Sequence, residues 1–97
     1  VGRDLERAAL SPDGQRVAYV VATARMDAEN SDFLSQIWVA SADGKTNYQF
    51  TYGDKSATDP QFSPDGQWLA FLSGRGKDGK RQIYRMRTTG GEAEPVT

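Results

Sequence analysis

The sequence predicts an all-β fold of two similar four-stranded antiparallel sheets, and three observations support this prediction. The tetrapeptide Ser-Pro-Asp-Gly occurs twice, at residues 11–14 and at residues 63–66. Each copy precedes an apolar run rich in β-branched or aromatic residues, at residues 17–21 and 68–72. No stretch of the chain shows the 3.6-residue apolar period of an amphipathic helix. A tight turn that leads into an apolar strand indicates a hairpin, and its recurrence at long spacing indicates a repeat architecture.

Composition limits the size and class of the protein. The 97 residues allow one domain at most. Twelve Lys and Arg residues nearly balance thirteen Asp and Glu residues, so the net charge of −1 provides no general attraction to nucleic acid or to an anionic membrane. The 37% of hydrophobic residues and the mean hydropathy of −0.67 predict a thin core for so short a chain.

Several classes of segment are absent from the sequence. The chain has no cysteine, which excludes disulfides, a thiolate nucleophile and a cysteine-based zinc site. This leaves the compartment open, with the cytoplasm favoured and the periplasm as the other choice. No apolar run approaches the roughly 20 residues of a membrane span, and no signal peptide is visible. The first residue is Val1, so we expect the chain to be a processed, cloned or proteolysed piece of a longer protein.

The first half predicts four strands. The strands are expected at residues 6–11, 15–24, 36–41 and 46–52. Both faces of the second strand are apolar, which predicts a strand covered on both sides. The polar stretch at residues 25–35 is expected to be an exposed loop. The Asp-Gly pair within residues 42–45 predicts a type I′ hairpin turn, and residues 53–56 are expected to connect the two halves.

The second half repeats this order. Strands are expected at residues 58–63, 67–73, 81–88 and 93–97. Pro60 stands near the start of its strand, where a missing N–H does little harm. A loop rich in Gly and Lys at residues 74–80 and a Gly-Gly turn at residues 90–91 separate the later strands.

Aligning the halves shows that they are copies of one unit. Residues 11–15 are identical to residues 63–67 at an offset of 52, whereas Gln36-Ile37 matches Gln82-Ile83 at an offset of 46. The difference of six residues is a longer loop in the first copy, around residues 27–32. Four strands per unit and a period of about 40–50 residues are typical of a β-propeller blade. The expected blades are residues 1–53 and residues 54–97, and together they make an incomplete propeller.

A resemblance to a known family adds to this interpretation. Residues 59–73 read Asp-Pro-Gln-Phe-Ser-Pro-Asp-Gly-Gln-Trp-Leu-Ala-Phe-Leu-Ser, and residues 82–86 and 90–97 continue the pattern. This resembles the blade signature of propellers in the prolyl oligopeptidase family of serine peptidases, particularly its acylaminoacyl-peptidase and dipeptidyl-peptidase branches. The periplasmic propeller of the Tol system shares the Ser-Pro-Asp-Gly blade.

The resemblance implies a gating role. In the peptidases an N-terminal propeller covers a C-terminal α/β-hydrolase domain and restricts access to small or unstructured peptides. The present chain would be a non-catalytic part of such a propeller. The alternative is a Tol-like or other stand-alone propeller that acts as a protein-binding module. A self-assembling structural repeat is a third hypothesis.

The chain itself carries no catalytic machinery. It has no G-x-S-x-G elbow and no histidine, which excludes a Ser-His-Asp triad within these residues. The paired glutamates that bind a substrate amino terminus in dipeptidyl peptidases have no clear match. No catalytic residue, metal ligand or cofactor-binding residue is therefore assigned, and no cofactor is expected.

Three polar motifs favour structural roles. Residues 74–79 spell G-x-G-x-x-G, but a strand rather than a helix follows, which favours a hairpin loop over a phosphate site. The oxygen-bearing side chains near residue 30 lack the spacing and the glycine of an EF-hand, which favours a solvated loop over a calcium site. The basic residues of the second half, with Tyr84 nearby, could contact single-stranded nucleic acid, but charges on exposed strands that discourage aggregation are the favoured interpretation. The oxygen-bearing residues are Asp27, Glu29, Asn30 and Asp32, and the basic residues are Arg75, Lys77, Lys80, Arg81, Arg85 and Arg87.

The aromatic and turn residues are assigned to structure as well. Packing is favoured over a ligand-stacking platform for Trp38, Trp68, Phe71 and Tyr84, and Trp68 is expected to be buried between the blades. The turn residues are expected to form local hydrogen bonds only. They are Ser11, Pro12, Asp13, Gly14, Ser63, Pro64, Asp65 and Gly66.

The expected partners follow from the incomplete propeller. They are a hydrolase domain of the parent chain, the peptide substrates of the parent, and further copies of this chain. Two blades cannot close a ring, so three copies would give six blades and four would give eight. No nucleic acid and no membrane are expected as partners.

Overall fold

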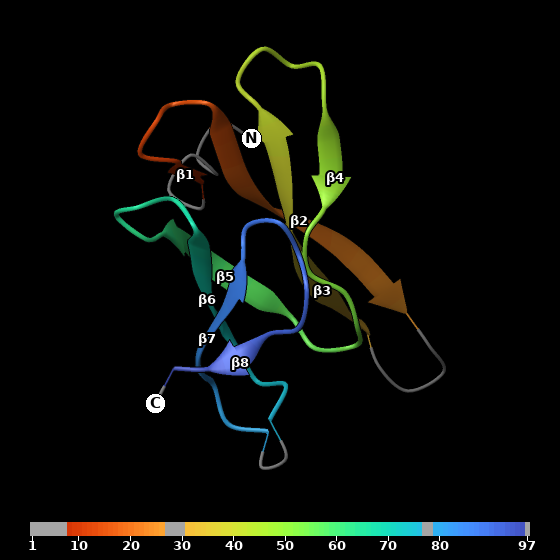
Figure 1. Ribbon diagram of the computed structural model, residues 1–97. Coiled ribbons are helices and arrows are strands. Elements are labelled where there is room, and N and C mark those ends of the chain that lie inside the picture. Colours follow the sequence, from red (N-terminus) through yellow and green to blue (C-terminus); the bar gives the residue numbers. More distant parts are fainter. Residues whose placement is uncertain (1–7, 27–30, 77–78, 97) are drawn as a thin grey trace.

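The chain folds into two four-stranded antiparallel sheets, which confirms the predicted all-β propeller architecture (Figure 1). The computed structural model describes residues 8–26, 31–76 and 79–96, without the side chains of residues 25–26 and 31–32. No helix occurs among these residues. The first sheet contains β1 (Ala9–Leu10), β2 (Arg16–Met26), β3 (Ser31–Ser41) and β4 (Asn47–Gln49). The second contains β5 (Ala57–Phe62), β6 (Trp68–Ser73), β7 (Gln82–Arg87) and β8 (Glu94–Pro95). In each sheet the strands lie in chain order.

The hairpin of β2 and β3 is longer than predicted. The two strands pair without interruption from Arg16 opposite Ser41 to Met26 opposite Ser31. The expected loop over residues 25–35 is therefore wrong at both ends, because the ladder satisfies the backbone groups of these polar residues and local polarity does not prevent pairing. Of the four residues weighed as calcium ligands, Asp27, Glu29 and Asn30 lie outside the described residues, and Asp32 is described only in its backbone.

The outermost strands are shorter than predicted. Strand β4 ends at Gln49 rather than Tyr52, and β8 covers only two residues of the expected 93–97. After β4 the chain turns inward, and the N–H groups of Phe50 and Thr51 both donate to the Ile37 carbonyl, at 2.7 and 3.2 Å. Phe50 is thereby buried in the core instead of continuing the strand.

One apolar core lies between the sheets. Strand β5 contacts β1, β2 and β3, so the second sheet lies against a face of the first. Phe71 and Tyr84 stack within this core, with ring centroids 6.2 Å apart and an interplanar angle of 18°. The buried apolar residues are Ala18, Ile37, Val39 and Phe50 from the first half, and Ala57, Leu69, Phe71, Tyr84 and Met86 from the second.

The two sheets use opposite faces in this contact. Ala18 and Ile37 of the first sheet face the second, but their counterparts in the repeat, Ala70 and Ile83, share the other face of their sheet with Trp68. We call the face that bears Ala18 and Ile37, or Ala70 and Ile83, the leading face, and the opposite face the trailing face. The leading face of one sheet therefore packs against the trailing face of the next, as in successive blades of a propeller.

One face of each sheet is not covered by the other sheet. On the trailing face of the first sheet, Val17 and Tyr19 are only half-buried and Val21 is 36% exposed. The prediction that this strand is covered on both sides is therefore wrong for the described chain.

Trp68 is not buried between the sheets, contrary to the prediction. Strand β6 alternates its side chains, so Leu69 and Phe71 point into the core and Trp68 points to the leading face. There its ring is half-buried between two guanidinium groups, 4.1 Å from that of Arg85 and 4.4 Å from that of Arg87. These cation–π contacts replace the expected packing between blades.

Three turns with the same hydrogen bonds lie at one rim of the sheets (Figure 1). In the first, Ser11 Oγ donates to Asp13 Oδ1 at 2.6 Å and accepts from Arg16 N at 3.0 Å. The Ser63 and Ser41 turns repeat these two bonds at the same distances. The third turn was predicted as type I′, which requires positive φ at both central residues. That prediction is wrong, because Asp59 is the only non-glycine residue with positive φ in the part of the chain that is described.

Candidate functional site

The connections at the other rim differ from one another in length and sequence. This rim carries the β2–β3 hairpin end, the β4–β5 connection and the β6–β7 loop (Figure 1). The opposite rim carries the repeated Ser-x-Asp-Gly turns, where Pro12 Cδ lies 3.7 Å from the position of a Cβ at Gly66. In repeat proteins the face with variable insertions is often the binding face. We therefore expect a binding site at the variable rim.

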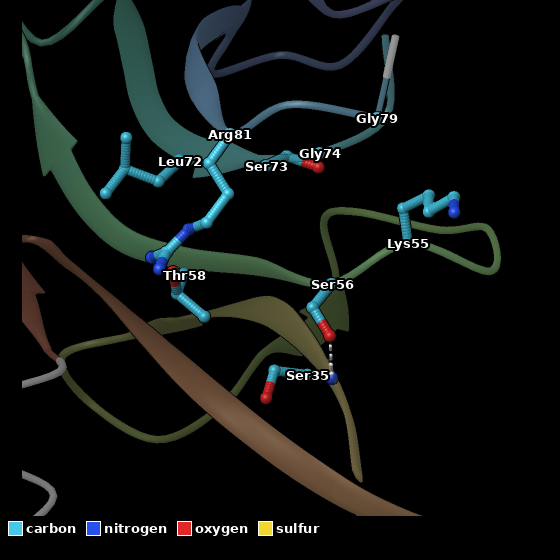
Figure 2. Close-up of a pocket in the computed structure, with 9 residues that line it drawn as sticks. All are labelled: Ser35, Lys55, Ser56, Thr58, Leu72, Ser73, Gly74, Gly79 and Arg81. Carbon is cyan, nitrogen blue, oxygen red and sulfur yellow. Dashed lines mark hydrogen bonds between the residues drawn. The ribbon is translucent and has the colours of Figure 1, made fainter. Parts of the chain in front are cut away.

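A cleft of about 380 Å³ opens at this rim between the two sheets (Figure 2). Its volume lies in the roughly 300–1,000 Å³ range of ligand pockets. The first sheet contributes one residue, the connection two, and the second sheet with its loop the remainder. The lining residues are Ser35, Lys55, Ser56, Thr58, Leu72, Ser73, Gly74, Gly79 and Arg81.

One hydrogen bond joins the two sides of the cleft. The backbone N–H of Ser35, in the first sheet, donates to the Ser56 hydroxyl oxygen at 3.0 Å, as the dashed line in Figure 2 shows. Ser56 lies immediately before β5, so this bond fixes the position where the chain enters the second sheet. The Ser56 hydroxyl is thereby held at the opening between the two sheets.

The charges at the cleft are positive. Among the described residues, Lys55 and Arg81 are the ionisable residues of the lining, and no Asp or Glu belongs to it. Arg81 extends from the start of β7 toward β5 (Figure 2). Its Nη2 lies 4.0 Å from Asp59 Oδ2. Both side chains of this pair are more than half exposed, so solvent screens the attraction and the guanidinium can accept a second partner.

Asp59 has an unusual backbone beside the cleft. Its φ is +57°, and the register of β5 and β6 shifts between Thr58 and Gln61. Aspartate tolerates this left-handed conformation better than most residues, and the Thr58 hydroxyl donates to its carboxylate at 3.0 Å. The bulge turns β5 away from a straight edge just after the cleft.

Gly74 and Gly79 of the β6–β7 loop lie close together at the end of the cleft. A Cβ at Gly74 would lie only 3.0 Å from the Gly79 carbonyl oxygen, so a larger residue would force the loop open. This close approach gives a physical reason for glycine in the G-x-G-x-x-G sequence. A strand, β7, follows the motif, so it lacks the helix that a dinucleotide site requires.

Arg75, in the β6–β7 loop, contacts Ser73 of the cleft lining. Its Nε donates to the buried Ser73 hydroxyl at 2.9 Å, and its guanidinium lies 5.2 Å from the centroid of the Phe71 ring. Burial lowers the pKa of this guanidinium from its usual value, and the nearby Tyr84 opposes that effect. Nη2 is buried without a hydrogen-bond partner among the described residues.

The structure disperses the predicted basic cluster. Arg85 and Arg87 lie over Trp68 on the leading face, Arg81 lines the cleft, and Arg75 packs on Phe71. Lys77 lies outside the described residues. Tyr84 is buried in the core, in agreement with the packing role favoured for it, so it forms no nucleic-acid surface with these arginines.

Local roles account for the carboxylates of the repeated turns. Hydrogen bonding from the serine hydroxyl is the main cause that lowers the pKa of Asp13, Asp43 and Asp65, and the N–H of a following residue adds to it. Pro12 and Pro64 occupy the exposed second position of their turns, and Gly14 and Gly66 have the positive φ that closes each turn.

The described residues contain no cluster of three or more His, Cys, Asp or Glu side chains that could hold a metal ion. No helix long and apolar enough to cross a membrane occurs in the described parts of the chain.

Sequence reasoning missed the cleft. Ser35 comes from the first sheet, whereas Ser56, Thr58 and Arg81 lie in or next to the second, so the cleft forms only when the two sheets pack. One local signal was available, because proline within a strand is confined to edge strands, strand starts and bulges, so Pro60 could have indicated the irregularity in β5.

Comparison with known proteins places the chain among propellers. Residues 6–97 match the family model described as TolB beta propeller domain. The chain is 41% identical over 87 residues to the uncharacterized peptidase YuxL of Bacillus subtilis. It is 41% identical over 61 residues to the Tol-Pal system protein TolB of Bordetella pertussis, a match that covers 62% of this chain and 14% of that protein.

Solved structures agree with this result. A TolB candidate protein from Agrobacterium tumefaciens superposes with a TM-score of 0.71 at 30% identity, over 94% of this chain and 29% of that one. TolB from Acinetobacter baumannii, at 23% identity and a TM-score of 0.64, supports the fold alone. The YuxL match covers 90% of this chain but only 13% of the relative, so the chain spans a small part of the proteins it matches.

Proposed function

The chain belongs to the TolB β-propeller domain family, and we propose that it supplies two blades to the non-catalytic propeller of a peptidase. In this proposal the propeller covers a hydrolase domain of the prolyl oligopeptidase type and admits small or unstructured peptides. The blades shape the opening and carry out no chemistry. The partners are then the hydrolase domain of the same parent chain and the peptides that pass the propeller.

The match to YuxL is the main support for this proposal. It extends over 87 residues, whereas the match to TolB of Bordetella pertussis at the same 41% identity extends over 61. The blade signature at residues 59–73, which resembles that of the prolyl oligopeptidase propellers, agrees with it. The absence of histidine from the chain is compatible with a role outside the catalytic centre.

A stand-alone, Tol-like propeller that binds another protein is the second candidate. The match to the Tol-Pal system protein of Bordetella pertussis and the family description support it. The two candidates differ in one property of the parent protein, since only the first requires a catalytic serine hydrolase domain.

The decisive experiment uses the full-length protein that contains this segment. We expect a fluorophosphonate probe to label it covalently at one serine, and we expect it to cleave short peptides. A folded protein that carries the same cleavage sequence in a surface loop should be cleaved at least ten times more slowly than the free peptide. Absence of both labelling and cleavage would reject the peptidase proposal in favour of the binding module. Equal cleavage rates for the peptide and the folded protein would reject the gating role but not the peptidase assignment.

A further inference from the structure

The rim cleft has the features of a site for a single negatively charged group. Two cationic side chains, Lys55 and Arg81, border it, and no carboxylate belongs to its lining among the described residues. Ser56 and Thr58 add hydroxyl groups, and Leu72 adds a half-buried apolar surface. We propose that this cleft binds the carboxylate of an extended peptide, with Arg81 as the residue that recognises the charge.

Arg81 is suited to this role by its present contacts. Its only described ion pair, with Asp59, is long at 4.0 Å and lies in solvent. A guanidinium presents parallel N–H groups that fit a carboxylate in a bidentate manner, and such bonds are about twice as strong as neutral ones. A ligand carboxylate can therefore replace Asp59 as the partner of Arg81 at a small cost in free energy. Asp59 keeps the hydrogen bond from Thr58.

The rest of the lining favours a peptide over a phosphate. The described lining contains no helix N-terminus, the element that commonly supplies backbone N–H groups to a phosphate. The hydroxyls and Leu72 suit the polar and apolar parts of an uncharged backbone. The bulge at Thr58 and Gln61 interrupts the free edge of β5, so the ligand would be held by side chains rather than by addition of a strand.

The inference rests on this chain alone and does not require the parent to be a peptidase. It is tested with the 97-residue chain by two-dimensional amide NMR at low salt. The probe is N-acetyl-Ala-Ala with a free carboxylate, and the comparison ligands are its C-terminal amide and inorganic phosphate. We expect the free carboxylate to shift the amide signals of Ser56, Thr58, Gly74 and Gly79, and the amide derivative to leave them in place.

Three variants test whether Arg81 recognises the ligand carboxylate. Arg81→Gln should weaken binding by roughly tenfold or more, as expected for the loss of a charge-assisted hydrogen bond. Arg81→Lys keeps the charge but loses the paired N–H donors of the guanidinium. Its affinity should lie between those of Arg81→Gln and the wild type. Arg87→Gln removes the same charge at the far end of β7, on the leading face and away from the cleft, and should change affinity less than about twofold. The amide spectrum of each variant reports whether it is folded.

The possible outcomes separate clearly. Carboxylate-dependent shifts that Arg81→Gln abolishes and Arg87→Gln preserves would support the proposal. Equal binding of the amide derivative, tighter binding of phosphate, equal loss in the two glutamine variants, or no shift at saturating peptide would each overturn it. None of these outcomes depends on hydrolase activity, so failure here is distinct from failure of the proposed function.

Discussion

A single serine hydroxyl ties together the two ends of each repeated turn. Ser11 Oγ accepts from the N–H of Arg16 and donates to the Asp13 carboxylate, and Ser11 is buried. Removing this hydroxyl leaves the Arg16 N–H without its partner. We therefore predict that Ser11→Ala lowers the free energy of unfolding by about 1 kcal/mol, measured by urea denaturation. Ser41→Ala, in the more exposed third turn, should cost less, and equal effects would show that burial of the turn does not matter.

The turn carboxylates also predict how stability depends on acid. Serine hydroxyls lower the folded-state pKa of Asp13, Asp43 and Asp65 below the ordinary value of 3.8. A group with a depressed folded-state pKa stabilises the fold above its unfolded-state pKa, and this contribution is lost as the pH falls through the folded-state value. Stability should thus begin to decline as the pH approaches 3.8 and continue to fall below it.

The three Asp-to-Asn substitutions combined test this assignment. The amide oxygen of asparagine can still accept the turn hydrogen bonds, but it does not titrate in this range. Urea denaturation at several pH values between about 6 and 2.5 should show a shallower decline for the triple variant than for the wild type. An unchanged decline would mean that other carboxylates control the acid transition.

At the level of the strand, β6 separates a core face from an open face. Leu69 is fully buried, whereas its neighbour Trp68 is half-buried between two arginines. We predict that Leu69→Ala costs about 2–5 kcal/mol through cavity formation. Trp68→Ala should cost about 1 kcal/mol, the scale of exposed cation–π contacts. Denaturation midpoints for the two variants give the comparison, and a larger loss for Trp68 would restore the original expectation that this ring packs between blades.

How far the sequence predicts each element depends on the range of the signal. The Ser-Pro-Asp-Gly tetrapeptides carry their own hydrogen-bonding groups, and the structure places turns at both. The Ser41 turn has the same chemistry without proline, and its serine was overlooked because Asp-Gly alone suggested type I′. The ends of β2 and β3 depend on cross-strand pairing, and the cleft depends on the packing of two sheets. Composition over short windows contains neither kind of information.

On the scale of the whole molecule, the two sheets form a stack whose outer faces are uncovered. The leading face of the first sheet is covered by the trailing face of the second, which leaves one face of each kind uncovered within this chain. Ile83 on the free leading face is 43% exposed, and Leu10 on the free trailing face is 63% exposed. A leading face of one copy and a trailing face of another would form a heterologous contact. Such contacts close into a ring of copies when the rotation between neighbouring copies permits it.

This geometry predicts self-association of the isolated chain. In a longer parent the neighbouring blades would cover both free faces, whereas further copies must do so for these 97 residues alone. Light scattering coupled to gel filtration should therefore give masses three or four times 10.7 kDa as concentration rises, for six or eight blades. Ile83→Glu should return the chain to a monomer, because burying the new carboxylate in the contact costs desolvation free energy. Tyr52→Glu, at a residue that is 64% exposed on the β4–β5 connection, should leave association unchanged. A single 10.7 kDa species at every concentration would mean that the open faces are stable in water without a partner, and that the mode of packing between the two sheets does not extend beyond them.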